Sequence, residues 1–240
     1  MAPYQMTGVA LVTGAASGIG RATCHAFAAE GVTKFVLADV NEEGLKTTAS
    51  ELKSANSEVK TLVVKTDTSK ESDVENMVGS AVKEFGSIAY CVNAAGVTSA
   101  PRKRTHELPM EAWDRVIAIN LRGVHLCAKT EITQMLKQEC DLPMITGAPA
   151  ERGSIVNISS ILGRTGNQNS GSYTAAKHGV LGLTRNDACA YSREGIRVNA
   201  VCPGAIYTPL MEQSLAEGSA YDKVLQRTPV SVAASVWLPL

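Results

Sequence analysis

Hydrophobic and polar positions follow two alternating patterns along the chain. Short apolar runs of strand length end in polar or glycine-containing turns, and the longer stretches between them repeat apolar residues at helical spacing. In one such stretch, Val74, Val78 and Ala81 fall on one helical face. Strands are predicted at 9–12, 34–39, 59–65, 88–92, 153–159 and 197–202. Helices are predicted at 18–30, 42–55, 70–85, 109–138, 172–193 and 209–217.

This alternation indicates one α/β domain over residues 1–240. Continuous apolar strands favour a parallel sheet with both faces covered by helices. The first four strands match the doubly wound nucleotide-binding pattern, which predicts a Rossmann-type fold in three layers with strand order 3-2-1-4-5-6. Loops at the carboxyl ends of the strands surround the site in such folds, and they are expected at about 97–108, 161–171 and 203–228.

The composition of the chain bears on which partners and which compartment are expected. Lys and Arg number 23, as do Asp and Glu, so the net charge is zero and gives no electrostatic reason to expect nucleic acid or a membrane surface. No apolar run approaches the ~18 residues of a membrane span. The six cysteines lack metal-ligand spacing and lie mostly in apolar runs, which favours buried thiols in a reducing compartment. Without a signal-peptide pattern at residues 1–7, we expect a cytoplasmic protein.

A glycine-rich turn, Thr-Gly-Ala-Ala-Ser-Gly-Ile-Gly at 13–20, lies between the first strand and the first helix. Glycines allow a tight turn there and let a pyrophosphate approach the helix N-terminus, where free N–H groups and the helix dipole favour an anion. A purely structural turn is the alternative. The candidate cofactor-binding residues of the turn are Gly14, Ser17, Gly18, Ile19 and Gly20.

Asp39 ends the second strand, 19 residues after Gly20. A carboxylate at this position accepts hydrogen bonds from the adenosine ribose hydroxyls and repels a 2′-phosphate. Positions 15–17 of the turn carry no Arg or Lys, so NAD is favoured, with NADP as the second candidate. Alternatively, Asp39 caps the helix that starts near Asn41.

Ser160, Tyr173 and Lys177 form a candidate catalytic group. Tyr173 and Lys177 are four residues apart on a predicted helix, so their side chains project from one face. A free phenol has a pKa near 10, and a nearby ammonium favours the phenolate, which gives a usable acid or base. Ser160 lies 13 residues before Tyr173, just past a strand, and can hydrogen-bond the same substrate oxygen.

With these motifs in this order, the chain resembles the short-chain dehydrogenase/reductase family in its compact form. The resemblance covers about residues 6–230. Its motifs are the TGxxxGIG turn at 13–20, NAAG at 93–96, Asn120, Ser160, Tyr173-x-x-x-Lys177 and Pro203-Gly204.

The resemblance implies further cofactor contacts. Asn93, Ala94 and Gly96 belong to a segment that stabilises the central sheet and lines the adenosine side of the cofactor. Asp67 and Thr68 match the segment near the adenine ring. The segment that holds the nicotinamide carboxamide is matched by Pro203, Gly204, Ile206 and Thr208.

The resemblance also implies a mechanism, in which a hydride moves between nicotinamide and a secondary alcohol or ketone, such as a secondary metabolite. Tyr173 moves the hydroxyl proton, and Lys177 lowers the tyrosine pKa and binds the nicotinamide ribose. Ser160 positions the substrate oxygen. Asn120 interrupts the long helix and holds a water of the proton relay.

Two further expectations follow from the same resemblance, and a third follows from the residues alone. The apolar tail after residue 228 is short, so we expect the family's seventh strand to be missing. A non-catalytic or impaired dinucleotide-binding protein is therefore the alternative function. The helices at 109–138 and 172–193 match the family's dimer interface, so a homodimer or homotetramer is expected. A basic run at 102–106 reads as a solvated loop or as a means of attracting an acidic substrate.

Overall fold

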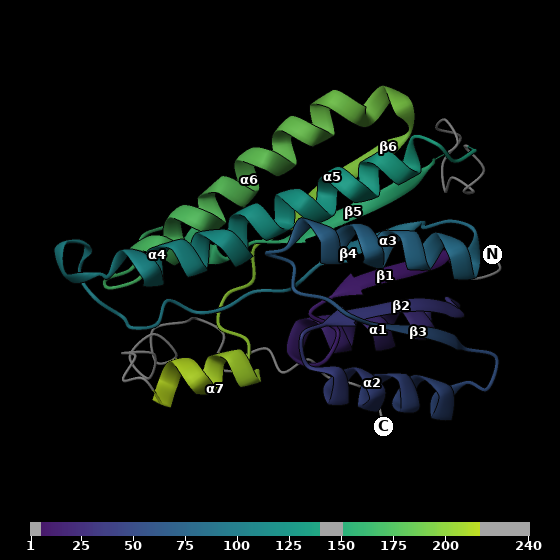
Figure 1. The fold of residues 1–240 in the computed structure, drawn as a ribbon, viewed down its shortest axis with the longest axis horizontal. Coiled ribbons are helices and arrows are strands. Elements are labelled where there is room, and N and C mark those ends of the chain that lie inside the picture. Colours follow the sequence, from purple (N-terminus) through teal and green to yellow (C-terminus); the bar gives the residue numbers. More distant parts are fainter. Residues whose placement is uncertain (1–5, 140–150, 217–240) are drawn as a thin grey trace.

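The computed structural model describes residues 6–139 and 151–216 and contains a parallel sheet with strand order β3-β2-β1-β4-β5-β6 (Figure 1). This confirms the predicted Rossmann-type α/β fold. The strands are β1 (Val9–Thr13), β2 (Lys34–Asp39), β3 (Lys60–Lys65), β4 (Tyr90–Asn93), β5 (Gly153–Ile158) and β6 (Ile196–Val201). The helices are α1 (Gly18–Ala29), α2 (Glu42–Ala55), α3 (Glu71–Phe85), α4 (Met110–Ile117), α5 (Val124–Met135), α6 (Gly171–Tyr191) and α7 (Pro209–Ala216).

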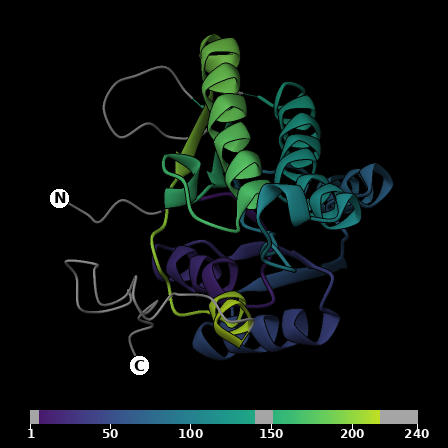
Figure 2. The ribbon, with the colours of Figure 1, turned by 90° about the vertical axis from the view of Figure 1, so that its left-hand side faces the viewer.

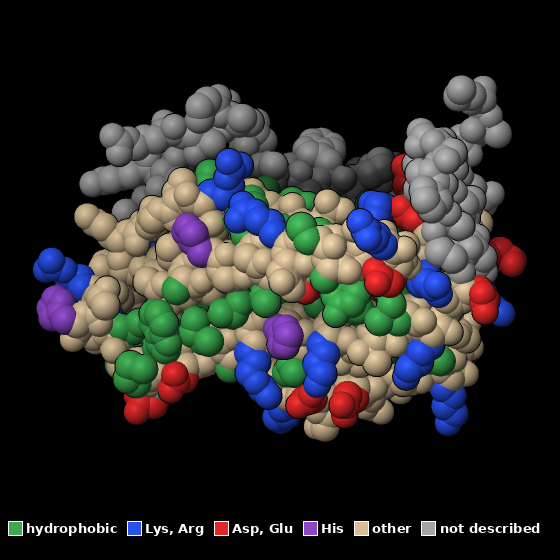
Figure 3. Space-filling view, turned by 90° about the horizontal axis from the view of Figure 1, so that it is seen from above, with side chains coloured by type: hydrophobic (Ala, Val, Ile, Leu, Met, Phe, Trp, Pro, Cys, Tyr) green, Lys and Arg blue, Asp and Glu red, His purple; other side chains and the backbone are tan. Residues whose placement is uncertain are grey.

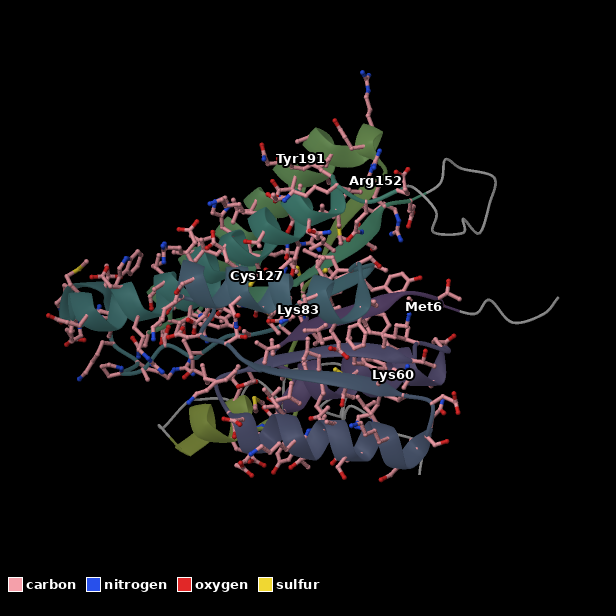
Figure 4. The ribbon with its side chains drawn as sticks, turned by 45° about the vertical axis from the view of Figure 1, so that its right-hand side comes forward. Met6, Lys60, Lys83, Cys127, Arg152 and Tyr191 are labelled. Atoms are coloured by element: carbon pink, nitrogen blue, oxygen red, sulfur yellow. The ribbon has the colours of Figure 1, made fainter. Side chains whose placement is uncertain are left out.

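Two helical layers cover the sheet (Figure 1 and Figure 2). Helices α1, α2 and α7 lie on one side, and α3, α4, α5 and α6 lie on the other. Successive side chains of β1 point to opposite faces of the sheet. Leu11 packs in the core that contains residues of α3 and α5, and Val12 packs in the core that contains residues of α1 and α2. Cys127, labelled on α5 in Figure 4, is buried in the first of these cores.

The long helix predicted at 109–138 is interrupted in the structure. A π-helical turn at Ala118–Gly123 separates α4 from α5 and contains Asn120. The amide of Asn120 makes two bonds to one backbone residue of the loop after β4: its Oδ1 accepts from the Val97 N–H at 2.9 Å, and its Nδ2 donates to the Val97 oxygen at 2.8 Å. π-Turns recur at functional sites because the extra residue re-aims a side chain, and here that side chain is Asn120.

The fourth strand begins two residues later than the sequence pattern predicts. The Ile88 N–H donates to Gln138 Oε1 at 3.0 Å, and the Ile88 oxygen accepts from Gln138 Nε2 at 2.8 Å. Because a side chain at the end of the α5 segment takes these backbone groups, Ile88 lies in the approach to β4 rather than in the strand. The expectation of a missing seventh strand concerns residues after 216, which lie outside the described part of the chain.

A buried polar network connects β4, α5, β5 and α6. Asn93 Nδ2 donates to Glu131 Oε2 and to Asn157 Oδ1, both at 3.0 Å, and Asn157 Nδ2 donates to Thr184 Oγ1 at 3.0 Å. Glu131 is fully buried, and this burial raises its pKa from about 4.5 to about 7, despite the opposing effect of the Asn93 hydrogen bond. A carboxyl group that is partly neutral at physiological pH thus lies beneath the sheet's carboxyl edge.

We expect the stability of the fold to depend on pH through Glu131. Between pH 4.5 and about 7 the folded protein holds a proton that the unfolded chain has released, so the free energy of unfolding falls as pH rises, by about 3 kcal/mol in all. Glu131→Gln should therefore raise the free energy of unfolding at pH 8 by about 1–3 kcal/mol and change it little at pH 5. Urea denaturation at both pH values measures this.

The exposed Glu75 on α3 offers a matched control for this prediction. Glu75→Gln should leave the difference between pH 5 and pH 8 as it is in the unsubstituted protein. An equal pH dependence in Glu131→Gln and the unsubstituted protein would show that Glu131 does not take up a proton on folding.

Candidate active site

The glycine-rich turn lies in close contact with the segment after β4. A Cβ on Gly14, which has φ +70°, would lie 2.8 Å from the Ala94 carbonyl carbon, and a Cβ on Gly20 would lie 2.1 Å from the Gly14 oxygen. Thr13 Oγ1 accepts hydrogen bonds from the N–H groups of Ala94 and Ala95 at 3.1 and 3.3 Å. Only glycine fits at these two positions, so the turn and the 93–96 segment have one fixed relation.

The turn opens onto a cavity of about 330 Å³. Ser17 is the N-cap of α1, but its side chain makes no capping bond, and the first turn of α1 contains no acidic residue. The helix end thus keeps its N–H groups and the positive end of its dipole for an anionic group. The predicted cofactor residues that line this cavity are Gly14, Ser17, Gly18, Ile19, Gly20, Asp39, Asp67, Thr68, Ala94, Gly96 and Thr208.

Asp39 is held at the rim of this cavity by two backbone groups. Its Oδ2 accepts from the Ala16 N–H at 3.2 Å, and its Oδ1 accepts from the Asn41 N–H at 2.9 Å. The cap of α2 is Asn41 itself, whose Oδ1 accepts from the Gly44 N–H at 3.1 Å. The N-cap of α2 is therefore Asn41, and the alternative that Asp39 caps this helix does not hold.

Asp67 and Thr68, which follow the neighbouring strand β3, line the same cavity. A hydrogen bond of 2.7 Å from the Ser69 hydroxyl lowers the pKa of Asp67, so this carboxyl stays ionised. Thr68 is buried and packs on the π-turn, where a Cβ on Gly123 would lie 3.0 Å from Thr68 Oγ1. The π-turn thus supports this wall of the cavity as well as the loop after β4.

A second cavity, of about 140 Å³, adjoins the first along shared lining residues such as Ile19, Gly96 and Thr208. Ser160, two residues after the end of β5, lines it and accepts a 3.1 Å bond from the Leu162 N–H. The predicted site residues that line this second cavity are Ile19, Ala94, Gly96, Ser160, Tyr173, Lys177, Pro203, Gly204, Ile206 and Thr208.

Tyr173 and Lys177 lie on the first turns of α6 with their side chains together. Lys177 Nζ lies 5.6 Å from the centroid of the Tyr173 ring and donates to the Ile158 oxygen at 2.8 Å. Lys177 is only 4% exposed, and burial lowers its pKa to about 8. A compact cation whose charge is held in place by a strand-end carbonyl thus faces the phenol ring.

Asn120 and Asn93 are the two predicted site residues that line neither cavity. Asn93 lies beneath the site in the buried network with Glu131. Asn120 lies directly behind Gly96, because a Cβ on Gly96 would be 2.9 Å from Asn120 Oδ1 and 3.8 Å from Lys177 Nζ. The structure thus places Asn120 beside the lysine and Asn93 in the supporting layer.

Several supporting hydroxyls at the start of α6 were not found by sequence reasoning. Ser159 Oγ donates to the Lys177 oxygen at 2.8 Å, and Ser99 Oγ lies 3.1 Å from Ser172 Oγ. Ser99 Oγ also accepts from the Tyr173 N–H at 3.3 Å. A serine pair at the end of β5 was a visible signal for Ser159. Ser99 and Ser172 are 73 residues apart and carry no sequence signal.

Comparison with known proteins adds to this geometry. A family model described as short chain dehydrogenase matches residues 8–218. The chain belongs to the short-chain dehydrogenase/reductase family. Cis-4-hydroxycyclohexanecarboxylate dehydrogenase of Sinomonas cyclohexanicum is 45% identical over 203 residues, which cover 85% of this chain and 75% of that protein. Levodione reductase of Leifsonia aquatica is 39% identical over 207 residues, covering 86% of this chain and 72% of that protein.

Solved structures of the short-chain dehydrogenase/reductase family agree with the fold. A crystal structure of levodione reductase has a TM-score of 0.86 at 36% identity, covering 95% of this chain and 86% of that one. A variant of actinorhodin polyketide ketoreductase, solved with NADPH, has a TM-score of 0.84 at 32% identity, covering 96% and 86%. The chain therefore belongs to a family of oxidoreductases that binds nicotinamide dinucleotides, and the named relatives are dehydrogenases or reductases. No helix of the described residues has the length and hydrophobicity needed to span a membrane.

We expect Asn120→Ala to lower the free energy of unfolding by about 1–3 kcal/mol. The substitution leaves the Val97 N–H and oxygen without their side-chain partners in a partly buried place. The exposed Asn186 on α6 provides the control, since Asn186→Ala should change stability by less than about 0.5 kcal/mol. Equal urea midpoints for the two variants would contradict a role of Asn120 in holding the loop after β4.

Proposed function

We propose that this short-chain dehydrogenase/reductase is an NAD(H)-dependent enzyme that interconverts secondary alcohols and ketones, with Tyr173 as its general acid and base. The observation that carries this proposal is the joining of the two cavities. The larger one presents a helix N-terminus and Asp39, and the smaller one presents Ser160, Tyr173 and Lys177. A ring alcohol is a reasonable substrate, because one relative is named for a hydroxylated cyclohexane.

The residues of the larger cavity suit the parts of a dinucleotide. The first turn of α1 would hold the pyrophosphate, and Asp39 would accept the adenosine ribose hydroxyls. Asp67 and Thr68 would flank the adenine, and residues 203–208 would hold the carboxamide end. When bound, the nicotinamide ring donates or accepts the hydride.

The proton is handled by the chain's own residues. Tyr173 would give its hydroxyl proton to the carbonyl oxygen during reduction and recover it during oxidation. Lys177 favours the phenolate through its positive charge, and the Ile158 carbonyl keeps its ammonium in place. Ser160 would donate to the same substrate oxygen. Asn120, behind Gly96 and beside Lys177, would complete the proton path.

The preference for NAD over NADP rests on charge around Asp39. Its carboxylate would repel a 2′-phosphate, and the turn at 15–17 offers no cation. The nearest arginine in sequence, Arg21, is already engaged: its Nη2 donates to the Ala16 oxygen at 2.6 Å, and its Nη1 lies 3.6 Å from Glu51 Oε1. Arg21 therefore already binds other groups and is not placed to neutralise a 2′-phosphate.

Tyr173→Phe should lower kcat/KM for any active secondary alcohol by at least about 100-fold, the usual loss on removing a general acid or base. The Kd for NADH, measured by its fluorescence, should stay within about twofold of the value for the unsubstituted protein. Tyr191→Phe, at the far end of α6, is the control for the loss of an unrelated tyrosine hydroxyl. Full activity in Tyr173→Phe would refute the assigned acid and base. NADH binding without turnover of any alcohol by the unsubstituted protein would favour a non-catalytic dinucleotide-binding protein.

Asp39→Asn should raise the ratio of kcat/KM with NADP to that with NAD by about tenfold or more. The amide keeps the shape and an acceptor oxygen but removes the charge that repels a 2′-phosphate. The exposed Asp114 on α4 is the control, and Asp114→Asn should leave the ratio unchanged. An unchanged ratio in Asp39→Asn would remove this carboxylate from cofactor selection.

We also propose that the protein is a homo-oligomer through the face formed by α4, α5 and α6. Hydrophobic side chains gather at the α4 end of this face in Figure 3, and Met110 at the start of α4 is 62% exposed. Sedimentation at micromolar concentration should give at least twice the chain mass of 25.3 kDa. A single species of chain mass would show that the face is not an interface between copies.

A further inference from the structure

A buried hydroxyl group lies behind the glycine-rich turn, and the proposed mechanism does not use it. Thr48, in the middle of α2, is fully buried and lines neither cavity. Its Oγ1 donates to the Ala15 oxygen at 2.9 Å. The same Oγ1 lies 3.1 Å from the oxygen of Gly44, one turn earlier in its own helix, so the contact with the glycine-rich turn is the shorter of the two.

Arg21 on α1 fixes the direction of this hydroxyl. Arg21 Nε donates to Thr48 Oγ1 at 3.1 Å, and Arg21 Nη2 donates to the Ala16 oxygen at 2.6 Å. A guanidinium donates and cannot accept, so Thr48 accepts from Arg21 and keeps its own proton for a carbonyl oxygen. Glu51 holds the guanidinium from α2, since its Oε1 lies 3.6 Å from Arg21 Nη1. The hydroxyl therefore presents its proton to the turn in a defined direction.

The peptide group between Ala15 and Ala16 connects Thr48 to Asp39. This peptide bond is trans and planar, so the Ala15 C=O and the Ala16 N–H point in opposite directions within one rigid unit. Thr48 donates to the C=O, and the N–H donates to Asp39 Oδ2 at 3.2 Å. Donation to a carbonyl also polarises its amide and strengthens the bond that the N–H makes. A buried side chain of α2 thus acts on the carboxylate at the rim of the larger cavity.

The first turn of α2 packs against the same peptide groups. A Cβ on Gly44 would lie 2.8 Å from the Ala16 Cβ and 2.9 Å from the Ala16 oxygen. Asn41, the N-cap of α2, donates its N–H to Asp39 Oδ1 at 2.9 Å. Both hydrogen bonds that hold the Asp39 carboxylate therefore depend on where α2 lies against the glycine-rich turn.

We propose that Thr48 is a positioning residue for recognition of the adenosine ribose: through the peptide group of Ala15 and Ala16, it directs the Asp39 carboxylate toward the ribose hydroxyls of NAD. This inference rests on the proposed function, and it assigns part of the NAD preference to a side chain outside both cavities. Removal of the hydroxyl leaves the charge of Asp39 in place and releases its direction. The ribose of NADP offers a 2′-phosphate instead of the hydroxyl pair, so the loss falls on NAD.

The test measures dinucleotide binding in variants of α2. Thr48→Val removes the donor at nearly constant volume, Thr48→Ala removes it without a branched side chain in the buried place, and Thr48→Ser keeps it. Thr47→Val is the matched control, because the exposed Thr47 Oγ1 donates to the Glu43 oxygen at 3.0 Å within α2 and makes no contact with the turn. The Kd values for NADH and NADPH are measured by fluorescence titration, and the stability of each variant by urea denaturation.

We expect Thr48→Val and Thr48→Ala to raise the Kd for NADH by about 3- to 10-fold, the range of one neutral hydrogen bond. The Kd for NADPH should stay within about twofold, and so should both Kd values in Thr48→Ser and Thr47→Val. The kcat at saturating NAD and the KM for an alcohol should not change, because Tyr173 and Lys177 line the other cavity. A merely structural role would weaken the binding of both dinucleotides alike.

A double-mutant cycle checks that Thr48 acts through Asp39. In the Asp39→Ala protein the carboxylate is absent, so Thr48→Val should change the Kd for NADH by less than about twofold. An effect in Asp39→Ala as large as that in the unsubstituted protein would show that Thr48 acts on another part of the site, and it would overturn the inference.

The outcomes separate this inference from the proposed function. Equal Kd values for NADH in Thr48→Val and Thr47→Val, or an equal rise for NADH and NADPH, would overturn the inference and leave the oxidoreductase function standing. NADH binding that depends on Thr48, but without turnover of any alcohol, would support the inference and count against the enzymatic proposal. Failure of the unsubstituted protein to bind either dinucleotide would overturn both.

Discussion

The close approach of the glycine-rich turn to the segment after β4 is the constraint on which the site depends. Strands β1 and β4 are neighbours in a parallel sheet, so their carboxyl ends meet at one edge. Gly14 and Ala94 touch there because no Cβ stands between them, and the Thr13 hydroxyl binds two N–H groups of the same segment. This contact sets where the N-terminus of α1 points, and it also sets the position of Gly96, which borders both cavities.

A second level of order comes from hydrogen bonds among polar groups that the fold buries. Asn120 binds Val97 twice, Asn93 binds Glu131 and Asn157, and Lys177 binds the Ile158 oxygen. Buried polar groups are costly without partners, so each of these bonds restricts its neighbours to one arrangement. The same burial alters ionisation: it lowers the pKa of Lys177 to about 8 and raises that of Glu131 to about 7. The Lys177 ammonium is therefore fixed in place by a strand-end carbonyl, and it loses its charge at a lower pH than an exposed lysine does.

Much of the fold was predictable because it depends on local pattern. Buried parallel strands require continuous apolar runs, so β2 and β3 lie close to their predicted ranges. The departures from the predicted elements also have physical causes. The strand at 88–92 begins late because a glutamine 50 residues away takes the backbone groups of Ile88, a partner that no local window contains. The long helix at 109–138 keeps its apolar face through the π-turn, so its periodicity alone does not reveal the interruption.

By itself, the sequence determined the order of strands and helices and the identities of the glycines, Asp39, Ser160, Tyr173 and Lys177, because these follow from spacing along the chain. Tertiary structure decided what those residues face. It placed Asn93 beneath the site and Asn120 behind Gly96. It gave the N-cap of α2 to Asn41 rather than to Asp39. In the loop after β4, Arg102 lines the smaller cavity, whereas Lys103 and Arg104 are exposed. The reason is that side chains on one loop have the same local composition, and only the contacts made across the sheet's edge distinguish the one that is anchored from its neighbours.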